Sequence, residues 1–320
     1  MRHSIYITFA FLLVFGYFHV ANTPIAVNLM AQEAQTEAEQ PAQPAERAPV
    51  RLESVAIHFE GDDVRSLPWL PEWSARATQI CIEWFPYVDK LLETEGFVPQ
   101  PTMNIRFRNM DGVAHATGNS IVISTNWIRP GTNWEEEWWG MVVHELVHVI
   151  QQYPGGGGGR GGQGLPGWAM EGLTDYIRHV HFEPTRPMRA FAANHNYDGS
   201  FQISAGFFMY IVENYDKDFI QTLNRMGRTR TWTPEIFVKS TGKTAPELWA
   251  SFTATVRQPH MDAGTRMIPA EQFPNIMRYK REFEEGLVAQ GVTMPRRTQQ
   301  IPPQGGQGGQ GQRGQRPQQN

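Results

Sequence analysis

The sequence contains one cysteine, Cys81, among 320 residues. A single thiol cannot form a disulfide within the chain, so an exported form of this protein must be stabilised by its hydrophobic core. Cys81 stands between two isoleucines, which is typical of a small buried apolar residue. The sequence also lacks an excess of positive charge: its formal net charge is −4. This charge gives no electrostatic basis for binding nucleic acid.

The N-terminus has few charged residues. Arg2 precedes a short apolar stretch from Ile5 to Phe18, a pattern typical of a secretory signal peptide. No cluster of charges follows that would stop transfer, so we predict that residues 1–31 are a signal peptide cleaved between 21 and 31. The protein would then be secreted, periplasmic or attached to the cell surface, without stable membrane insertion. The alternative is an uncleaved anchor, because 20–30 stays fairly apolar.

Large apolar side chains are also scarce at both ends of the mature chain. Residues 32–49 consist mainly of Gln, Ala, Glu and Pro, and 294–320 of Gln, Gly, Pro and Arg without an acidic residue. Such segments cannot bury enough apolar surface to fold, so we predict a disordered linker and a disordered tail. With 40% hydrophobic residues in the whole chain, the remaining 50–293 can form one domain with a sizeable core.

Hydrophobic patterning within this domain predicts an α+β fold. Alternating residues predict strands at 50–59, 103–108 and 120–125, and an amphipathic pattern predicts a helix at 73–92. We therefore expect a small twisted β-sheet packed on a helical core.

The most informative motif is H-E-L-V-H at 144–148, inside an apolar run. On a helix, His144 and His148 lie on the same face and can bind one ion, while Val142, Val143, Leu146 and Ile150 face a core. We expect this helix to begin near Thr132 or Asn133, with a glutamate three residues later, and to end before Pro154.

A catalytic zinc site usually has three protein ligands and one open position. A second helical pattern follows at 167–178, where Glu171 and Asp175 share a face. Glu171 is the predicted third ligand, and Asp175 is placed to accept the outer N–H of a zinc-binding histidine. The sequence thus predicts one Zn²⁺ per chain. The alternative interpretation is a structural histidine pair without a metal.

Four segments of the sequence resemble the basic secretory protein family, the peptidases of plants and bacteria. They are H-E-L-V-H-V-I-Q-Q-Y at 144–153, W-A-M-E-G-L-T-D-Y-I-R at 168–178, N-M-D-G-V-A-H-A-T-G-N at 109–119 and S-T-G-K-T-A-P-E-L-W at 240–249. The resemblance covers roughly 50–255. Residues 155–164 depart from it, since they are richer in glycine than expected.

That family is grouped with the gluzincin metallopeptidases. The resemblance implies a gluzincin-like core in which His144, His148 and Glu171 are zinc ligands and Glu145 is the catalytic base. It predicts a secreted metallopeptidase that hydrolyses peptide or protein substrates through a zinc-activated water. The alternative function is a non-catalytic extracytoplasmic binding or scaffold protein with a structural zinc.

Further residues are weaker candidates. The segment Ala114-His115-Ala116 is expected either as an exposed edge strand beside the zinc, where an extended peptide can add a strand, or as an ordinary solvent-facing strand. His179, His181, His195 and Tyr197 are candidates for a ligand or a transition-state donor, against the simpler interpretation that they are packing or surface residues.

Overall fold

The computed structural model describes residues 47–133, 135–154, 164–189, 195–199, 201–255, 266–267 and 269–296. All of them belong to the second of two units into which the chain divides, and that unit begins at Arg47. The predicted signal peptide, the linker up to Glu46, the glycine-rich 155–163 and the tail from 297 lie outside the described residues. Among the described helices, none has the length and apolar character needed to cross a membrane.

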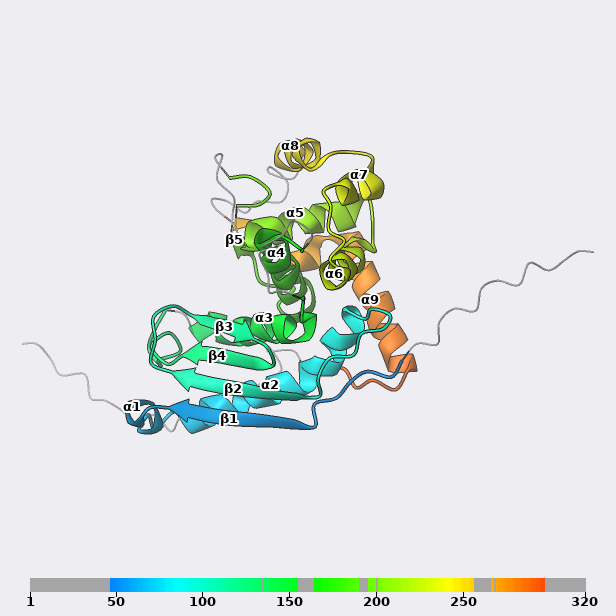
Figure 1. The fold of residues 1–320 in the computed structure, drawn as a ribbon. Helices are drawn as coiled ribbons and strands as arrows, with labels where there is room; N and C mark the ends of the chain where they lie inside the picture. Colours follow the sequence, from blue (N-terminus) through cyan, green and yellow to red (C-terminus); the bar gives the residue numbers. More distant parts are fainter. Residues whose placement is uncertain are drawn as a thin grey trace, which may run out of the picture. The chain divides into compact units, whose positions relative to one another are not determined.

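A four-stranded sheet forms one part of the fold, with the strand order β1-β2-β4-β3 (Figure 1). The strands are β1 (Ser54–Glu60), β2 (Thr102–Arg108), β3 (Ala114–Thr117) and β4 (Ser120–Ser124). The first three in this order are parallel, and β3 runs antiparallel to β4. Gly118, with a φ of 56°, allows the tight turn between β3 and β4. Strand β3 therefore stands at the edge of the sheet.

Two helices pack on this sheet. Helix α2 (Leu70–Leu91) contacts β2, where the ring centroids of Trp73 and Phe107 are 5.7 Å apart. Helix α3 (Trp138–Gln151) contacts α2, β3 and β4. In β2, alternate residues Met103, Ile105 and Phe107 are buried, as the period of two predicts.

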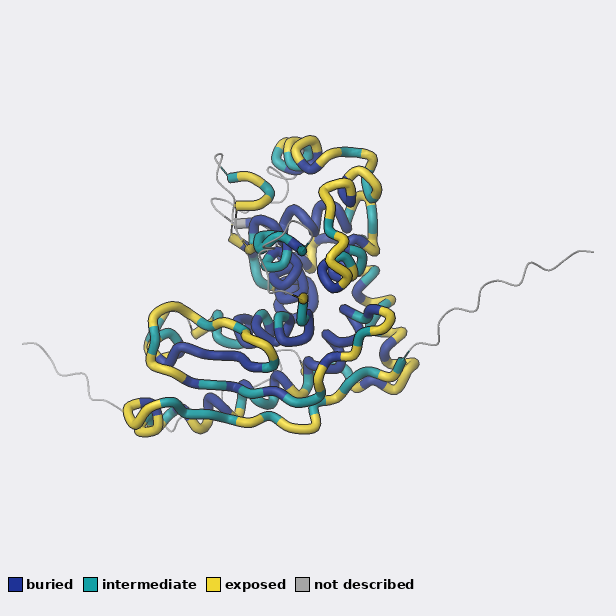
Figure 2. Tube along the Cα trace, in the orientation of Figure 1, coloured by how far each residue is buried: buried dark blue, intermediate teal, exposed yellow. Residues whose placement is uncertain are grey.

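The rest of the described chain is mostly helical. It contains α1 (Asp62–Arg65), α4 (Gly167–Ile177), α5 (Phe201–Asn214), α6 (Phe219–Thr229), α7 (Glu235–Thr241), α8 (Ala245–Thr255) and α9 (Pro274–Ala289), with short turns η1 (Glu135–Glu137), η2 (Arg178–Phe182) and η3 (Ala270–Gln272). A two-stranded pair joins β5 (Met188–Arg189) to β6 (Arg266–Met267). Helices α3, α4 and α5 are largely buried (Figure 2). The predicted mixed fold, with a small sheet and mostly helices, is confirmed.

Helices α4 and α5 lie unusually close together at Gly172. A Cβ atom there would lie 2.5 Å from the Cβ of Ser204, which is closer than real contacts allow. Glycine is therefore needed for the two helices to approach, and α5 supports the back of α4.

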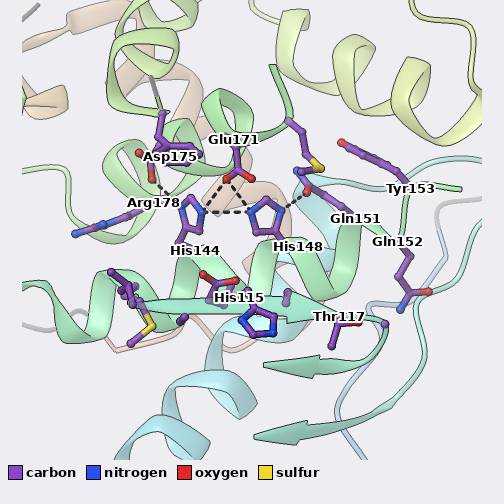
Figure 3. Close-up of a pocket in the computed structure, with 18 of the residues that line it drawn as sticks. His115, Thr117, His144, His148, Gln151, Gln152, Tyr153, Glu171, Asp175 and Arg178 are labelled. Carbon is purple, nitrogen blue, oxygen red and sulfur yellow. Dashed lines mark hydrogen bonds and ion pairs between the residues drawn. The ribbon is translucent and has the colours of Figure 1, made fainter. Parts of the chain in front are cut away.

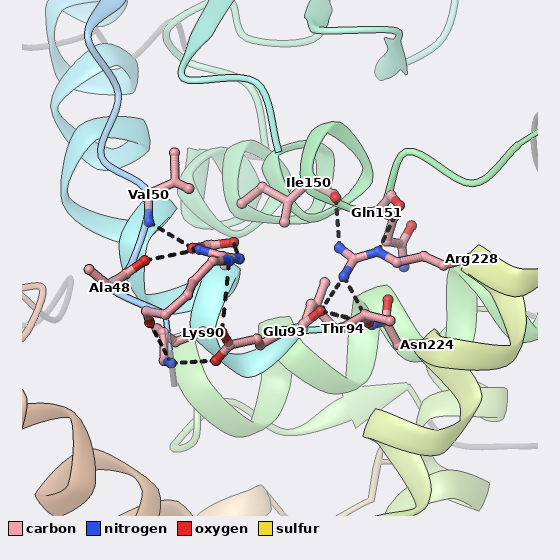
Figure 4. Close-up of polar contacts among 12 residues, drawn as sticks. Ala48, Val50, Lys90, Glu93, Thr94, Ile150, Gln151, Asn224 and Arg228 are labelled. Carbon is pink, nitrogen blue, oxygen red and sulfur yellow. Dashed lines mark hydrogen bonds and ion pairs between the residues drawn. The ribbon is translucent and has the colours of Figure 1, made fainter. Parts of the chain in front are cut away.

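Residues 47–49, which the sequence assigns to the linker, contact the C-terminal end of α2 (Figure 4). The Arg47 guanidinium donates to the Asp89 carboxylate at 2.7 Å, and the backbone N–H of Val50 donates to it at 2.8 Å. Lys90 donates to the carbonyl of Arg47 at 3.1 Å. Because Asp89 is only 1% exposed, its charge depends on these partners.

We expect Arg47→Ala to lower the free energy of unfolding by about 2 kcal/mol, because it leaves the buried Asp89 carboxylate without its cation. Chemical denaturation of the full chain measures this. Arg51→Ala, which removes an exposed arginine four residues later, is the matched control. Equal stability of both variants would contradict the role given to the Arg47–Asp89 pair.

Candidate metal centre

Helix α3 carries both histidines of the H-E-L-V-H motif. One side of α3 is at most 1% exposed at Val142, Val143, Leu146 and Ile150. The side chains of His144 and His148 are 14% and 12% exposed. The helix is thus apolar on one side and bears the histidines on the other, as its periodicity predicts.

The start of α3 differs from the prediction. The helix begins at Trp138, after the 3-10 turn η1, and no side chain caps it. The expected N-cap at Thr132 or Asn133 is therefore wrong. The glutamates at 135–137 form the short turn instead, and Glu137 serves as an ion-pair partner for Arg178. The end is as expected: Gln152 adopts a left-handed conformation with φ 43° before Pro154.

Helix α4 brings Glu171 to the two histidines (Figure 3). The Glu171 Oε2 atom lies 3.1 Å from His144 Nε2 and 3.0 Å from His148 Nε2, and these two nitrogens are 3.2 Å apart. Three donor atoms from three side chains therefore meet at one point. The predicted group of three is brought together as the sequence indicated.

The outer ring nitrogens of both histidines are also bound. His144 Nδ1 lies 2.7 Å from Asp175 Oδ1, so Asp175 takes the position expected for it. His148 Nδ1 lies 2.8 Å from Gln151 Oε1, a contact that sequence reasoning missed. The spacing of three residues between His148 and Gln151 on one helix was the available signal.

These contacts shift the pKa values of His144 and Glu171. Burial disfavours a charged His144 ring, but the charge and hydrogen bond of Asp175, together with Glu171, raise the pKa of His144 to about 10. Burial raises the pKa of Glu171, yet the contacts with the two neighbouring histidines outweigh burial and lower that pKa to about 2. The site therefore stabilises positive charge where the three donor atoms meet.

Glu145 faces the same cavity from α3. It is 6% exposed, and its Oε2 atom has no hydrogen-bond partner among the described residues. Burial raises the pKa of Glu145, and the neighbouring histidines partly offset this. An unpartnered carboxylate with a raised pKa is suited to taking up a proton.

A cavity of about 1170 Å³ opens over this group. It is lined by the three convergent side chains, by Glu145, and by the whole of β3. Strand β3 is thus an edge strand beside the candidate metal centre, the first of the two alternatives derived from the sequence. The further candidates do not contribute: the residues that line the cavity do not include His179, His181, His195 or Tyr197.

Two of these histidines are instead buried packing residues. His181 Nδ1 lies 2.7 Å from the Tyr87 hydroxyl. Neither ring nitrogen of His179 has a hydrogen-bond partner among the described residues, and burial lowers the pKa of His179 to about 3. A ring held neutral in this way fits the interpretation of a packing histidine.

A buried ion-pair cluster forms one wall of the cavity. Arg178, at the start of the π-helix η2, lines the cavity and pairs with Glu137 and Glu183, the latter at 3.2 Å. The cluster packs directly against α3 at Gly140, where a Cβ atom would lie 1.7 Å from Glu183 Oε1 and 2.4 Å from Arg178 Nε. Gly140 thus lets the cluster connect η2 to the helix that carries both histidines.

In a comparison with family models, the model described as peptidase of plants and bacteria matches residues 85–252, more than half of the chain. The chain belongs to the basic secretory protein family. The matched region contains α3, α4, β3 and every residue of the candidate metal centre. The family's description indicates a peptidase-like activity. Comparison with curated proteins found no match, and comparison with solved structures found none.

We expect Gly140→Ala in this basic secretory protein to lower the free energy of unfolding by about 2 kcal/mol or more, because the added methyl group overlaps the buried ion pairs. Gly286→Ala, in helix α9, is the matched control: a Cβ atom there meets nothing within 4 Å, and the change should stabilise the protein by about 0.5 to 1 kcal/mol. Thermal unfolding of both variants checks the opposite signs. A neutral or stabilising Gly140→Ala would show that the cluster does not constrain α3.

Proposed function

We propose that this protein is a zinc metallopeptidase of the gluzincin type, in which His144, His148 and Glu171 hold the zinc ion and Glu145 is the general base. The observation that carries the proposal is the meeting of two imidazole nitrogens and one carboxylate oxygen beside the unpartnered carboxylate of Glu145. Two histidines on one helix and a glutamate on the next are the arrangement that the resemblance implies.

The donor set fits zinc. Both histidines bind an acceptor through Nδ1, which leaves their Nε2 atoms to offer lone pairs. Two imidazoles with one carboxylate are a ligand set typical of catalytic zinc, and all three side chains line the cavity. Zinc held there would lower the pKa of a bound water and polarise the scissile carbonyl group.

The residues around this position supply the remaining chemistry. Glu145 accepts the proton of the attacking water and delivers it to the leaving amine, for which its raised pKa is suitable. Asp175 holds the ring of His144 in one orientation through the 2.7 Å hydrogen bond. The side chains of His144, His148 and Glu171 are largely buried, which strengthens each electrostatic interaction among them.

Strand β3 supports a peptide or protein as the substrate. It stands at the end of the strand order, so in the described sheet only its β4 side is paired. Its other side lies along the cavity. An extended peptide can add to such an edge through main-chain hydrogen bonds, which would place a peptide bond beside Glu145. The predicted signal peptide would make the proposed substrate extracytoplasmic.

The first prediction of the proposed function is the metal content. The full chain, purified without added metal, should contain close to one equivalent of zinc by elemental mass spectrometry, and removal of this zinc by a chelator should abolish peptide hydrolysis. A protein that takes up no zinc, even when zinc is offered and the excess removed, would refute the proposed ligand set.

The second prediction separates the roles of two glutamates. Glu145→Gln should keep the zinc but lower the turnover of an unfolded protein substrate by at least about 100-fold, because the general base is lost. Glu171→Gln should instead lose zinc. Glu53→Gln, at an exposed position away from the cavity, is the control for both. Zinc content and hydrolysis are measured together. Full activity in Glu145→Gln would rule out its role, and bound zinc without hydrolysis in the unmodified protein would favour the binding-protein alternative.

A further inference from the structure

The two histidines are held by chemically different partners. His144 binds the Asp175 carboxylate, which can only accept a hydrogen bond. His148 binds the side-chain amide of Gln151, which has an acceptor on one side and a donor on the other. The hydrogen of the neutral His148 ring is therefore on Nδ1 only if the amide turns its oxygen toward the ring. Something must fix the orientation of this amide.

One chain of hydrogen bonds from α4 does so. The backbone carbonyl of Met170 can only accept, and the Thr174 hydroxyl donates its single hydrogen to it at 2.9 Å. The Thr174 oxygen is then left to accept, and the Gln151 Nε2 group donates to it at 3.1 Å. Thr174 is fully buried, so water cannot replace this partner.

A second chain of hydrogen bonds links α2 and α6 to Tyr153, which follows the end of α3. The carbonyl of Leu92 accepts from Asn224 Nδ2 at 2.9 Å, which turns the Asn224 oxygen toward Tyr153. The Tyr153 hydroxyl donates to this oxygen at 3.1 Å. This chain holds the residues that follow α3 in place.

The backbone of Gln151 is fixed as well. Arg228, which is 8% exposed, donates to the carbonyls of Ile150 at 3.0 Å and Gln151 at 3.3 Å, and also to the carbonyl of Leu92 (Figure 4). These contacts satisfy carbonyl groups at the C-terminal ends of α3 and α2, which their helices leave unpaired. The end of α3 that carries Gln151 is therefore held against α2 and α6.

The chain through Thr174 begins at a backbone carbonyl, so it has one direction, and it ends on the Gln151 amide. We propose that Thr174 orients the Gln151 amide so that its oxygen faces His148 Nδ1, and that Gln151 is the positioning residue that keeps the His148 Nε2 lone pair toward the metal. The metal part of this inference rests on the proposed function. The ring tautomer does not, because it is a property of the protein without metal.

A reversed amide would have a definite consequence. Its NH₂ group would face Nδ1, which would have to accept, and the ring hydrogen would move to Nε2. That hydrogen would then point toward Glu171 Oε2, 3.0 Å away, and His148 could not act as a ligand without losing it.

The test compares Thr174→Val with Thr174→Ser in the full chain. Valine has the shape of threonine without the hydroxyl group, so one hydrogen of the Gln151 amide loses its acceptor; serine retains the hydroxyl. We expect Thr174→Val to weaken zinc binding about 10-fold, measured in competition with a chromophoric chelator. Thr174→Ser should bind zinc about as tightly as the unmodified protein. Thr78→Val is the matched control, since Thr78 donates to the carbonyl four residues earlier in α2, at 2.8 Å, in the same way.

The tautomer is read separately by ¹⁵N NMR of histidine-labelled protein without metal, at a pH at which the His148 ring is neutral. The signal of His148 is assigned with a His148→Gln variant. We expect the hydrogen on Nδ1 in the unmodified protein and a shift of population toward Nε2 in Thr174→Val. Thr174→Ala also removes the hydroxyl group and should give the same shift; this variant serves if Thr174→Val does not fold.

The outcomes separate the two proposals. If the unmodified protein binds no zinc but shows the expected tautomers, the proposed function fails and the positioning role stands. If it binds zinc but Thr174→Val keeps both the affinity and the tautomer of the unmodified protein, the positioning role is overturned. An equal loss of affinity in Thr174→Val and Thr78→Val would also overturn it, since the effect would then be one of helix stability.

Discussion

The structure of the site depends on bringing three lone-pair donors together within 3.2 Å. Two imidazole nitrogens and a carboxylate oxygen repel one another unless a proton or a metal ion lies between them. The chain overcomes this by rigid packing. Helix α3 is buried against the sheet and α2, and α4 is supported by α5 through the close approach at Gly172. The positions of the three donor atoms are therefore fixed by how α3 and α4 pack in the core.

The same constraint explains the charged groups around the cavity. Glu145, Glu171 and Asp175 place three carboxylates near two histidines, and this excess of negative charge favours a cation at the centre. On the neighbouring wall, the buried Arg178 is balanced by Glu137 and Glu183 and so adds little free positive charge to the cavity. The wall thus supports α3 mechanically and leaves the electrostatic potential at the candidate metal centre negative.

The parts of this site that were predictable from the sequence are those fixed by helical periodicity. The four-residue spacing of His144 and His148, and of Glu171 and Asp175, places each pair on one face whatever surrounds the helix. The mixed fold with a small sheet also followed from alternating and amphipathic patterns. The domain limits and the roles of the site residues remain predictions, because the fold places these side chains together but does not report what they do.

The parts that could not be predicted depend on which elements become neighbours. Helix α3 begins at Trp138, and the preceding Glu137 pairs with Arg178, about forty residues later in the chain. No local capping pattern reveals this ion pair. Gln151 lies three residues from His148, a spacing that the sequence shows, but the direction of its amide is set by Thr174 in α4. This contact arises only when α4 packs beside the end of α3.

The choice of a neutral amide behind His148 follows from the charge of the centre. A carboxylate there would fix the ring without any help, as Asp175 fixes His144, but it would be a fourth negative charge in a partly buried site that already has three. Glutamine avoids that charge at the cost of an ambiguous orientation. The ambiguity is removed through Thr174 by the backbone carbonyl of Met170, which carries no charge and can only accept hydrogen bonds. The buried hydroxyl of Thr174 is thus explained by the electrostatics of the centre beside it.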